Sequence, residues 1–273
     1  MTALSVLAGK ELKDSLRNRW LMASTLVFAG LALAITLFGG AASGSVGITP
    51  LPATLASLAS LATFLVPLMA LMLGYDAIVG EEEQGTLLLL LAYPLSRPAL
   101  LLGKFAGHAL LLALAMAMGF GLAAVTFMVF GDMAPGEVLL AFARFTGASI
   151  LLGWSCLALG YLVSTLASEK STAAGLALAV WFVMVLLFDL VLLAVLVATE
   201  GHFLSDSLPW LLMANPTDVY RLLSLGDAQG ALTGVLSLGA GLPGGTAGLW
   251  LALGTWTAVP LGAALWRFCK RPL

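Results

Sequence analysis

Three consecutive carboxylates, Glu81–Glu83, form the densest group of potentially reactive side chains in the sequence. Beside them, Gly80 and Gly85 have the spacing of a phosphate-binding P-loop, but Thr86 stands where that loop requires a lysine. The chain therefore has no Walker A motif, and any ATP hydrolysis must come from a partner. We place the carboxylates at the start of a short helix, because the positive end of a helix favours acidic side chains.

A second candidate is Asp189, which stands alone in the apolar stretch 173–198. A carboxylate inside a membrane span is costly and often functional. No basic residue lies in any apolar stretch to pair with it. Two roles therefore stay open: a functional group, or a structural group bonded to Ser, Thr or backbone and kept neutral by burial.

Metal ligands are scarce. Thioethers suit Cu(I), but the ten methionines are more typical of apolar packing. Cys156 falls within a predicted span and Cys269 near one end of the chain, while His108 and His202 are expected on opposite sides of the membrane. We expect neither a metal site nor a catalytic residue in this chain.

The composition indicates a membrane protein. Of the 273 residues, 61% are hydrophobic and 10% are charged, and the mean hydropathy is +1.06. Soluble domains carry about 25% charged residues, and a water-soluble fold of this size could not bury so much apolar surface. The same composition excludes disorder. The formal net charge of −2 gives a nucleic-acid partner no electrostatic support.

Charge-free stretches predict the membrane spans. A spanning helix needs about 20 apolar residues, and glycines and prolines between residues 39 and 52 split the first long stretch. We predict an all-α membrane protein with six transmembrane helices, at 20–38, 53–73, 105–130, 145–166, 173–198 and 248–266. A cytoplasmic N-terminus puts ten of the twelve lysines and arginines on the cytoplasmic side, so both termini are expected there.

Two polar segments lie on the cytoplasmic side in this topology. Residues 1–19 fit an amphipathic helix on the membrane surface, or a plain charged tail. The loop 76–104 holds the run Leu87–Leu91, which is apolar on every face. A helix of that kind needs one partner in the bundle and a second in a docked cytoplasmic protein, unless the loop is re-entrant and buried in its own bundle.

Particular residues predict local structure along the chain. Pro94 ends the leucine helix, and Ser96 caps the next one, which continues through Lys104. The pairs Gly103–Gly107 and Gly153–Gly160 offer small surfaces for close helix approach.

The periplasmic segment 199–247 is expected to form short helices on the outer face. Asn215 followed by Pro216 and, in the first turn, Asp218 is a good helix start. Candidates there for contact with an external partner, or for local structure, are Trp210, Asn215, Asp218 and Arg221.

The loop carries a family resemblance. The strings Glu83-Gln84-Gly85-Thr86-Leu87, Pro94-Leu95-Ser96-Arg97 and Leu102-Gly103-Lys104 resemble the signature of ABC-2-type transporter permeases. The resemblance implies a type V exporter-like permease domain over residues 1–273, with an entry helix, a cytoplasmic coupling helix and outer helices before the last span. It implies that ATP and Mg²⁺ belong to a cytoplasmic ABC ATPase. The residues assigned to ATPase coupling are Glu81, Glu82, Glu83, Gly85, Thr86, Pro94, Ser96, Arg97 and Lys104, with Glu169 and Lys170 as either a second contact or an exposed turn pair.

Longer strings, among them Tyr75-Asp76-Ala77-Ile78-Val79-Gly80-Glu81 and Asn215-Pro216-Thr217-Asp218, resemble the branch of that family that serves maturation of nitrous oxide reductase. This implies a homodimer in the lipid of the bacterial inner membrane, two ATPase copies, a periplasmic β-helix protein, and copper held by periplasmic partners. Either a sulfur species crosses, or ATP drives movements of a copper-handling partner. The alternatives are an ABC-2 exporter of drugs or lipids and a stand-alone secondary transporter. In the coupling hypothesis, changes at Glu81, Glu83 or Gly85 impair ATPase docking while the bundle still folds.

Overall fold

A computed structural model describes residues 9–10, 19–39, 49–92, 96–199, 208–225 and 245–271, and this part of the chain contains helices and no strand. Most of segment 1–19 and Pro94 lie outside it, so the predictions made there stay predictions. The helices are α2 (Arg19–Phe38), α3 (Leu51–Gly74), α4 (Val79–Glu83), α5 (Thr86–Ala92), α6 (Arg97–Phe130), α7 (Pro135–Leu166), α8 (Lys170–Phe182), the π-helix η2 (Val183–Leu187), α9 (Phe188–Ala198), α10 (Leu208–Met213), α11 (Pro216–Leu225) and α12 (Gly245–Lys270).

Five of the six predicted spans correspond to helices long and apolar enough to cross a membrane. They are built on α3, α6, α7, the continuous run α8–η2–α9, and α12. The helix over 20–38 is α2, which is apolar but shorter over the residues whose side chains are described. The chain is thus a multi-pass, all-helical membrane protein, while the count of six and the side of the termini stay predictions.

Two spanning helices extend beyond the predicted spans. Helix α6 begins at Arg97, as predicted from Ser96, whose hydroxyl accepts a hydrogen bond from the Ala99 amide (3.3 Å), and Pro98 suits the first turn. Helix α7 begins at Pro135 rather than 145. Both helices are therefore longer than the roughly 20 residues that cross the hydrocarbon layer, and their extra turns extend beyond it.

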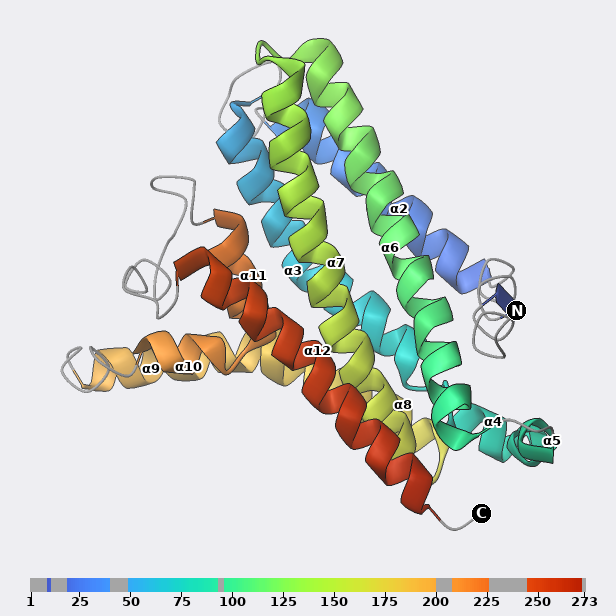
Figure 1. The fold of residues 1–273 in the computed structure, drawn as a ribbon. Helices are drawn as coiled ribbons and strands as arrows, with labels where there is room; N and C mark the ends of the chain where they lie inside the picture. The colour runs from blue at the N-terminus through green and yellow to red at the C-terminus, as the bar shows by residue number, and fades with distance from the viewer. Residues whose placement is uncertain are drawn as a thin grey trace.

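Helix α7 is the centre of the bundle. It crosses the middle of the molecule and packs against α3, α6 and α12 (Figure 1). Its side chains Leu152, Cys156 and Tyr161 are fully buried. The run α8–η2–α9 is the opposite case: it is the most apolar span, yet little of it is buried within the single chain. Its faces are left to lipid or to a second protein surface.

The bundle has two distinct ends (Figure 1). At one, here called the α5 end, lie α4, α5, the start of α8 and the last turn of α12. At the other, here called the α11 end, α10 and α11 pack near the beginning of α12, and α11 also contacts α3 and α7. The two groups of predicted site residues fall at opposite ends.

Helices α3 and α7 cross closely at a pair of glycines. A Cβ atom built on Gly160 would lie 3.0 Å from the Cα atom of Gly74 and 3.3 Å from the carbonyl oxygen of Leu71. A Cβ built on Gly153 would collide with the methyl group of Met116 on α6. The predicted small surface of Gly153–Gly160 on α7 is therefore confirmed as a contact surface.

We predict that Gly160→Ala lowers the free energy of unfolding by about 1–3 kcal/mol, because the new methyl group forces two backbones apart. The matched control is Gly121→Ala within α6, where a Cβ meets nothing within 4 Å. That change is expected to be neutral or to stabilise by up to about 1 kcal/mol. Thermal unfolding in detergent compares the two variants, and equal midpoints would show that the crossing tolerates a side chain.

Candidate functional site

The chain leaves α3 at Gly74 and reaches α4 through a turn that is fixed against α7. The amides of Ile78 and Val79 both donate to the hydroxyl of Ser164, at 3.0 and 3.1 Å. Any side chain at Gly80 would collide with the carboxylate of Asp76. These contacts hold α4 at the foot of the bundle before any charged residue is considered.

The predicted placement of the carboxylates holds for α4, where Glu81 and Glu82 lie in the first turn. The leucine run does not continue that helix. Gly85 adopts a positive φ of 70°, a backbone conformation that favours glycine, and α5 begins directly after it. The loop is therefore two short helices joined by a glycine turn.

Each of the three glutamates contacts a different spanning helix. Glu81 Oε1 lies 2.7 Å from Lys104 Nζ on α6. Glu82 Oε2 lies 3.0 Å from a guanidinium nitrogen of Arg271, which follows α12. Glu83 Oε1 accepts a hydrogen bond from the backbone amide of Lys170, the first residue of α8, at 2.6 Å. Three consecutive glutamates on one short helix thus connect α6, α8 and the end of α12.

The contact between Glu81 and Lys104 is the most buried of the three. Only 5% of the Lys104 side chain is exposed, compared with 20% of Glu81. An ammonium group in such a place needs a counter-ion, because taking it out of water without one costs several kcal/mol. Glu81 also accepts a hydrogen bond from the Thr86 hydroxyl, so the same carboxylate connects α4 to α5.

Arginines bind the carbonyl ends of two spans beside this cluster. Arg97, at the start of α6, donates to the carbonyl oxygens of Cys269 (3.1 Å) in the last turn of α12 and of Arg271 (2.7 Å) just after it. Arg271 in turn donates to the carbonyl oxygens of Thr165 (3.3 Å) and Ala167 (3.1 Å) at the end of α7. Such groups satisfy the free carbonyls at helix C-termini.

Glu169 and Lys170 were predicted to form either a second ATPase contact or an exposed turn pair, and the structure places the two residues differently. The Lys170 ammonium lies 2.5 Å from a carboxylate oxygen of Asp76, so it belongs to the same cluster. Glu169 is exposed. Neither Asp76 nor Arg271 was a candidate from the sequence.

Helix α5 presents one face to the bundle and one away from it. Leu87 is buried against the core, while Leu90 and Leu91 pack partly against it. Leu88 and Leu89 are 62% and 66% exposed. The predicted need for two partners is met on one side only, and a loop fully buried in its own bundle does not agree with these exposures.

At the α11 end, Asp189 has a basic partner, which comes from outside the predicted spans. The guanidinium of Arg221 on α11 makes an ion pair with it, and lies 3.4 Å from Asp218 Oδ1. No basic residue within a span pairs with Asp189, as predicted, but a short helix outside the spans folds back onto the fifth one and supplies Arg221. Asp189 is therefore an ion-pair partner in this conformation.

The same helix satisfies a carbonyl group within the π-helix. Asn215 Nδ2 (2.8 Å) and Thr217 Oγ1 (3.1 Å) both donate to the carbonyl oxygen of Met184. The Asn215 side chain also accepts from the Thr217 amide at 3.2 Å, which confirms the predicted helix start. A π-helix widens the backbone and changes its hydrogen-bond spacing, and α11 supplies donors at that position.

Asp218 is fully buried. Burial, and then the neighbouring charge of Asp189, raises the pKa of the Asp218 carboxyl above its ordinary range. The adjacent Tyr220 hydroxyl shares a hydrogen bond with Ser149 of α7 (3.0 Å), and burial raises its pKa as well. Of the four residues predicted to meet an external partner, only Trp210 is exposed, while the other three make these internal contacts.

The remaining candidates are structural in this conformation. Cys156 is buried and Cys269 exposed, and both are free thiols. His108 Nδ1 lies 2.8 Å from the Tyr161 hydroxyl. No cluster of three or more His, Cys, Asp or Glu side chains suited to a metal ion occurs among the described residues.

Comparison with known proteins agrees with this architecture. A model of the ABC-2 family of transporter proteins matches residues 5–273. The chain belongs to this family. It is 56% identical over 275 residues to the "probable ABC transporter permease protein NosY" of Pseudomonas aeruginosa, covering all of both chains. A protein of the same name from Stutzerimonas stutzeri is 57% identical over 268 residues, covering 97% of each.

As a permease subunit of an ABC transporter, an ABC-2 chain works with an ATPase partner. The glutamates predicted for ATPase docking point into this chain's own cluster, whereas the exposed leucines of α5 point away from it. The partners of Glu83 and Glu82 were not predicted from the sequence, because Lys170 lies 87 residues after Glu83 and Arg271 lies still farther from Glu82.

We predict that Glu81→Gln lowers the free energy of unfolding by about 2–4 kcal/mol, because it removes the carboxylate charge 2.7 Å from the buried Lys104 ammonium. Glu169→Gln, the same chemical change at an exposed position, is expected to stay within about 0.5 kcal/mol. Thermal midpoints in detergent measure both. A Glu81→Gln variant as stable as Glu169→Gln would contradict the role given to this pair.

A second prediction concerns the pH dependence of stability. An acid whose pKa is higher in the folded chain binds more protons when folded, so the free energy of unfolding falls as pH rises from its ordinary pKa through the raised one. For Asp218 the ordinary value is 3.8. Asp218→Asn is neutral like the protonated acid, and should cost less than about 1 kcal/mol while removing this slope.

The matched variant is Asp189→Asn, which takes from Arg221 its nearest carboxylate. We expect a loss of about 2 kcal/mol, moderated because 39% of the Asp189 side chain is exposed. Unfolding midpoints of both variants from pH 5 to pH 9 separate the two residues. Should Asp218→Asn keep the slope of the natural chain, Asp218 is not the group that titrates.

Proposed function

We propose that α5 docks a cytoplasmic ABC ATPase and that Glu81, Glu82 and Glu83 pass its movement into the membrane bundle. The observation that supports this most directly is the position of α5, whose two exposed leucines follow a helix bonded to α6, α8 and α12. An exposed apolar surface of this kind marks a protein interaction site.

Through the glutamate contacts, α4 is attached to the ends of three spans, α6, α8 and α12. A displacement of α5 is carried to α4 across the hydrogen bond between Thr86 and Glu81, and from α4 to the spans through its ion pairs. Packed helices respond to such a push as rigid bodies that shift between discrete arrangements. ATP supplies the energy only if the ATPase binds the two arrangements with different affinity.

The fifth span is the element best suited to move. Little of α8–η2–α9 is buried, so few apolar contacts hold it within the chain. It is attached at its beginning by Glu83 and Asp76, and at its centre by α11. π-helical segments inside α-helices often mark functional positions, which agrees with a change of shape at η2.

The finer assignment rests on relatives named NosY and on the strings noted above. We infer that the transporter serves maturation of the copper–sulfide centre of nitrous oxide reductase. In this proposal a homodimer of this chain lies in the bacterial inner membrane with both termini cytoplasmic. It carries two copies of a NosF-like ATPase and, on the periplasmic side, a NosD-like β-helix protein that handles copper. Either a sulfur species crosses, or ATP hydrolysis moves the periplasmic partner.

Two alternative functions have less support. An exporter of drugs or lipids would share the α5 arrangement, and only the likeness to proteins named NosY argues against it. A stand-alone secondary transporter would need an ion site within the membrane. Asp189, the candidate for such a site, is already paired with Arg221.

The test is a double substitution on α5, Leu88→Ser with Leu89→Ser. We expect the chain to fold normally, because both side chains are exposed, but to lose at least about tenfold in ATPase recovery when purified from its native membranes in mild detergent. Mass spectrometry and ATPase activity of the purified complex give the readout. The control is Leu139→Ser, a similarly exposed leucine near the opposite end of the bundle.

Full recovery of an active ATPase with the double variant would overturn the assignment of α5. Recovery of the natural chain alone, without ATPase activity, would overturn the permease proposal itself. Recovery of an ATPase without any periplasmic β-helix protein would favour the exporter of another substrate.

A further inference from the structure

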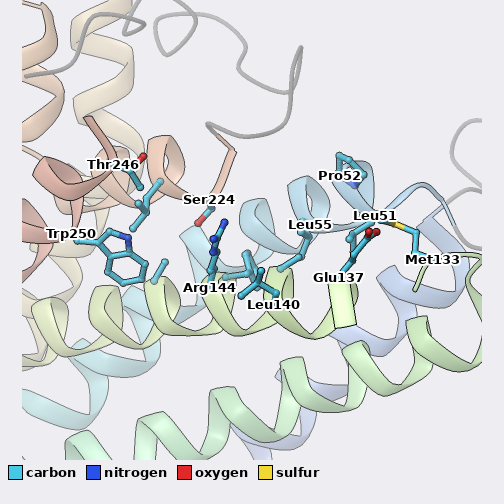
Figure 2. A pocket seen from close by; sticks show the side chains of 14 residues that line it. Leu51, Pro52, Leu55, Met133, Glu137, Leu140, Arg144, Ser224, Thr246 and Trp250 are labelled. Carbon is cyan, nitrogen blue, oxygen red and sulfur yellow. The ribbon is translucent and has the colours of Figure 1, made fainter. Parts of the chain in front are cut away.

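A cavity of about 720 Å³ opens at the α11 end, between α3, α7, α11 and α12. Figure 2 shows that it runs along α7, with Glu137 near one end, Arg144 in the middle and Trp250 of α12 at the other. Its volume lies within the range typical of small-molecule sites. No residue of the coupling cluster lines it.

The wall is apolar except for a few groups that point into the cavity (Figure 2). Glu137 and Arg144 both rise from α7, seven residues and therefore about 10 Å apart along the helix axis. Ser224 of α11 lies across the cavity from Arg144 in the same view. Within the part of the chain that the structure describes, neither charged residue is in an ion pair.

The position of Arg144 in the sequence indicates how deep the cavity lies in the membrane. It is the last charged residue before the charge-free stretch 145–168, so it lies where the hydrocarbon layer gives way to headgroups. Trp250, near the beginning of α12, is a side chain suited to the same level. Glu137 lies two turns farther from the membrane centre, while Phe145 and Ala148 line the cavity below Arg144.

From the membrane centre outward, the cavity therefore offers an apolar wall, then a cation with a hydroxyl group, then a carboxylate beside the apolar side chains of Leu51 and Met133. A phospholipid with an ethanolamine headgroup has the complementary order: acyl chain, phosphate, then ammonium. We propose that this cavity binds a phosphatidylethanolamine of the surrounding leaflet. Arg144 and Ser224 bind the phosphate, Glu137 binds the ammonium, and Phe145, Ala148 and Trp250 contact the upper acyl chains.

This occupant is favoured over a free phosphoethanolamine because the apolar wall would stay exposed without an acyl chain. It is favoured over an anionic lipid because Glu137 would then face no positive group. The depth of the cavity in the membrane is inferred from the predicted span of α7. The lipid proposal does not depend on ATPase docking. Its failure and that of the coupling proposal are therefore distinguishable.

The experiment uses the full chain purified in mild detergent, stripped of lipid and then incubated with phosphatidylethanolamine, phosphatidylglycerol or soluble phosphoethanolamine. Native mass spectrometry counts the molecules retained. We expect one phosphatidylethanolamine per chain, held at least about tenfold more tightly than phosphatidylglycerol, and no retained phosphoethanolamine. Retention of phosphoethanolamine alone, equal retention of both lipids, or retention of neither would overturn the proposal.

Variants assign the retained lipid to this cavity. Arg144→Gln is expected to weaken binding of both lipids by about tenfold, whereas Glu137→Gln should remove the preference for ethanolamine and leave phosphate binding intact. The matched controls are Arg267→Gln, at an exposed arginine on α12, and Asp132→Asn, at an exposed carboxylate outside the cavity lining.

A third variant, Leu55→Trp, fills the cavity without removing a charge and should displace the lipid. Thermal midpoints in lipid-free detergent show whether each variant is folded. If folded Arg144→Gln and Leu55→Trp chains retain phosphatidylethanolamine as the natural chain does, the lipid is bound elsewhere and the assignment is wrong.

Discussion

The ammonium group of Lys104 lies almost fully buried at the foot of α6, and the arrangement around it follows from the need to neutralise that charge. Glu81 supplies a carboxylate to it from α4, at 2.7 Å. Once Glu81 is fixed, the next two residues of the same short helix face other directions. Glu82 then reaches Arg271, and Glu83 reaches the start of α8. The three contacts of α4 with α6, α8 and the end of α12 thus lie side by side around one buried charge.

The two ends of the bundle are held by different kinds of contact. At the α5 end, charged side chains join helix termini, and arginines bind the free carbonyls that follow α7 and α12. At the α11 end, a short helix inserts hydrogen-bond donors and one guanidinium against the fifth span. Between these attachments the fifth span has few buried side chains. Its position is therefore set mainly by polar contacts at two places, which are directional and can be exchanged between two arrangements.

The sequence predicted the features that depend on local composition. Charge-free stretches located five spans, because hydrocarbon excludes charge along a continuous segment. Ser96 and Asn215 marked helix starts, because a cap depends on neighbours two or three residues away. The partners of Asp189 and of the glutamates were not predictable. They depend on how distant segments pack, and Arg221 lies on a helix that composition placed outside the membrane.

The glycine crossing of α3 and α7 shows a different limit. Gly160 drew notice as half of a small-residue pair on one helix, but its actual neighbour is Gly74 on another, where nothing in the sequence indicated a close approach. That crossing lies near the α5 end, where Ser164 of α7 also binds the turn that leads into α4. Helices α3 and α7 therefore cannot separate there without losing backbone contact and two hydrogen bonds. In the proposed coupling, a push on α5 would therefore turn the other helices about this fixed pair, and it would meet the least resistance at the weakly packed fifth span.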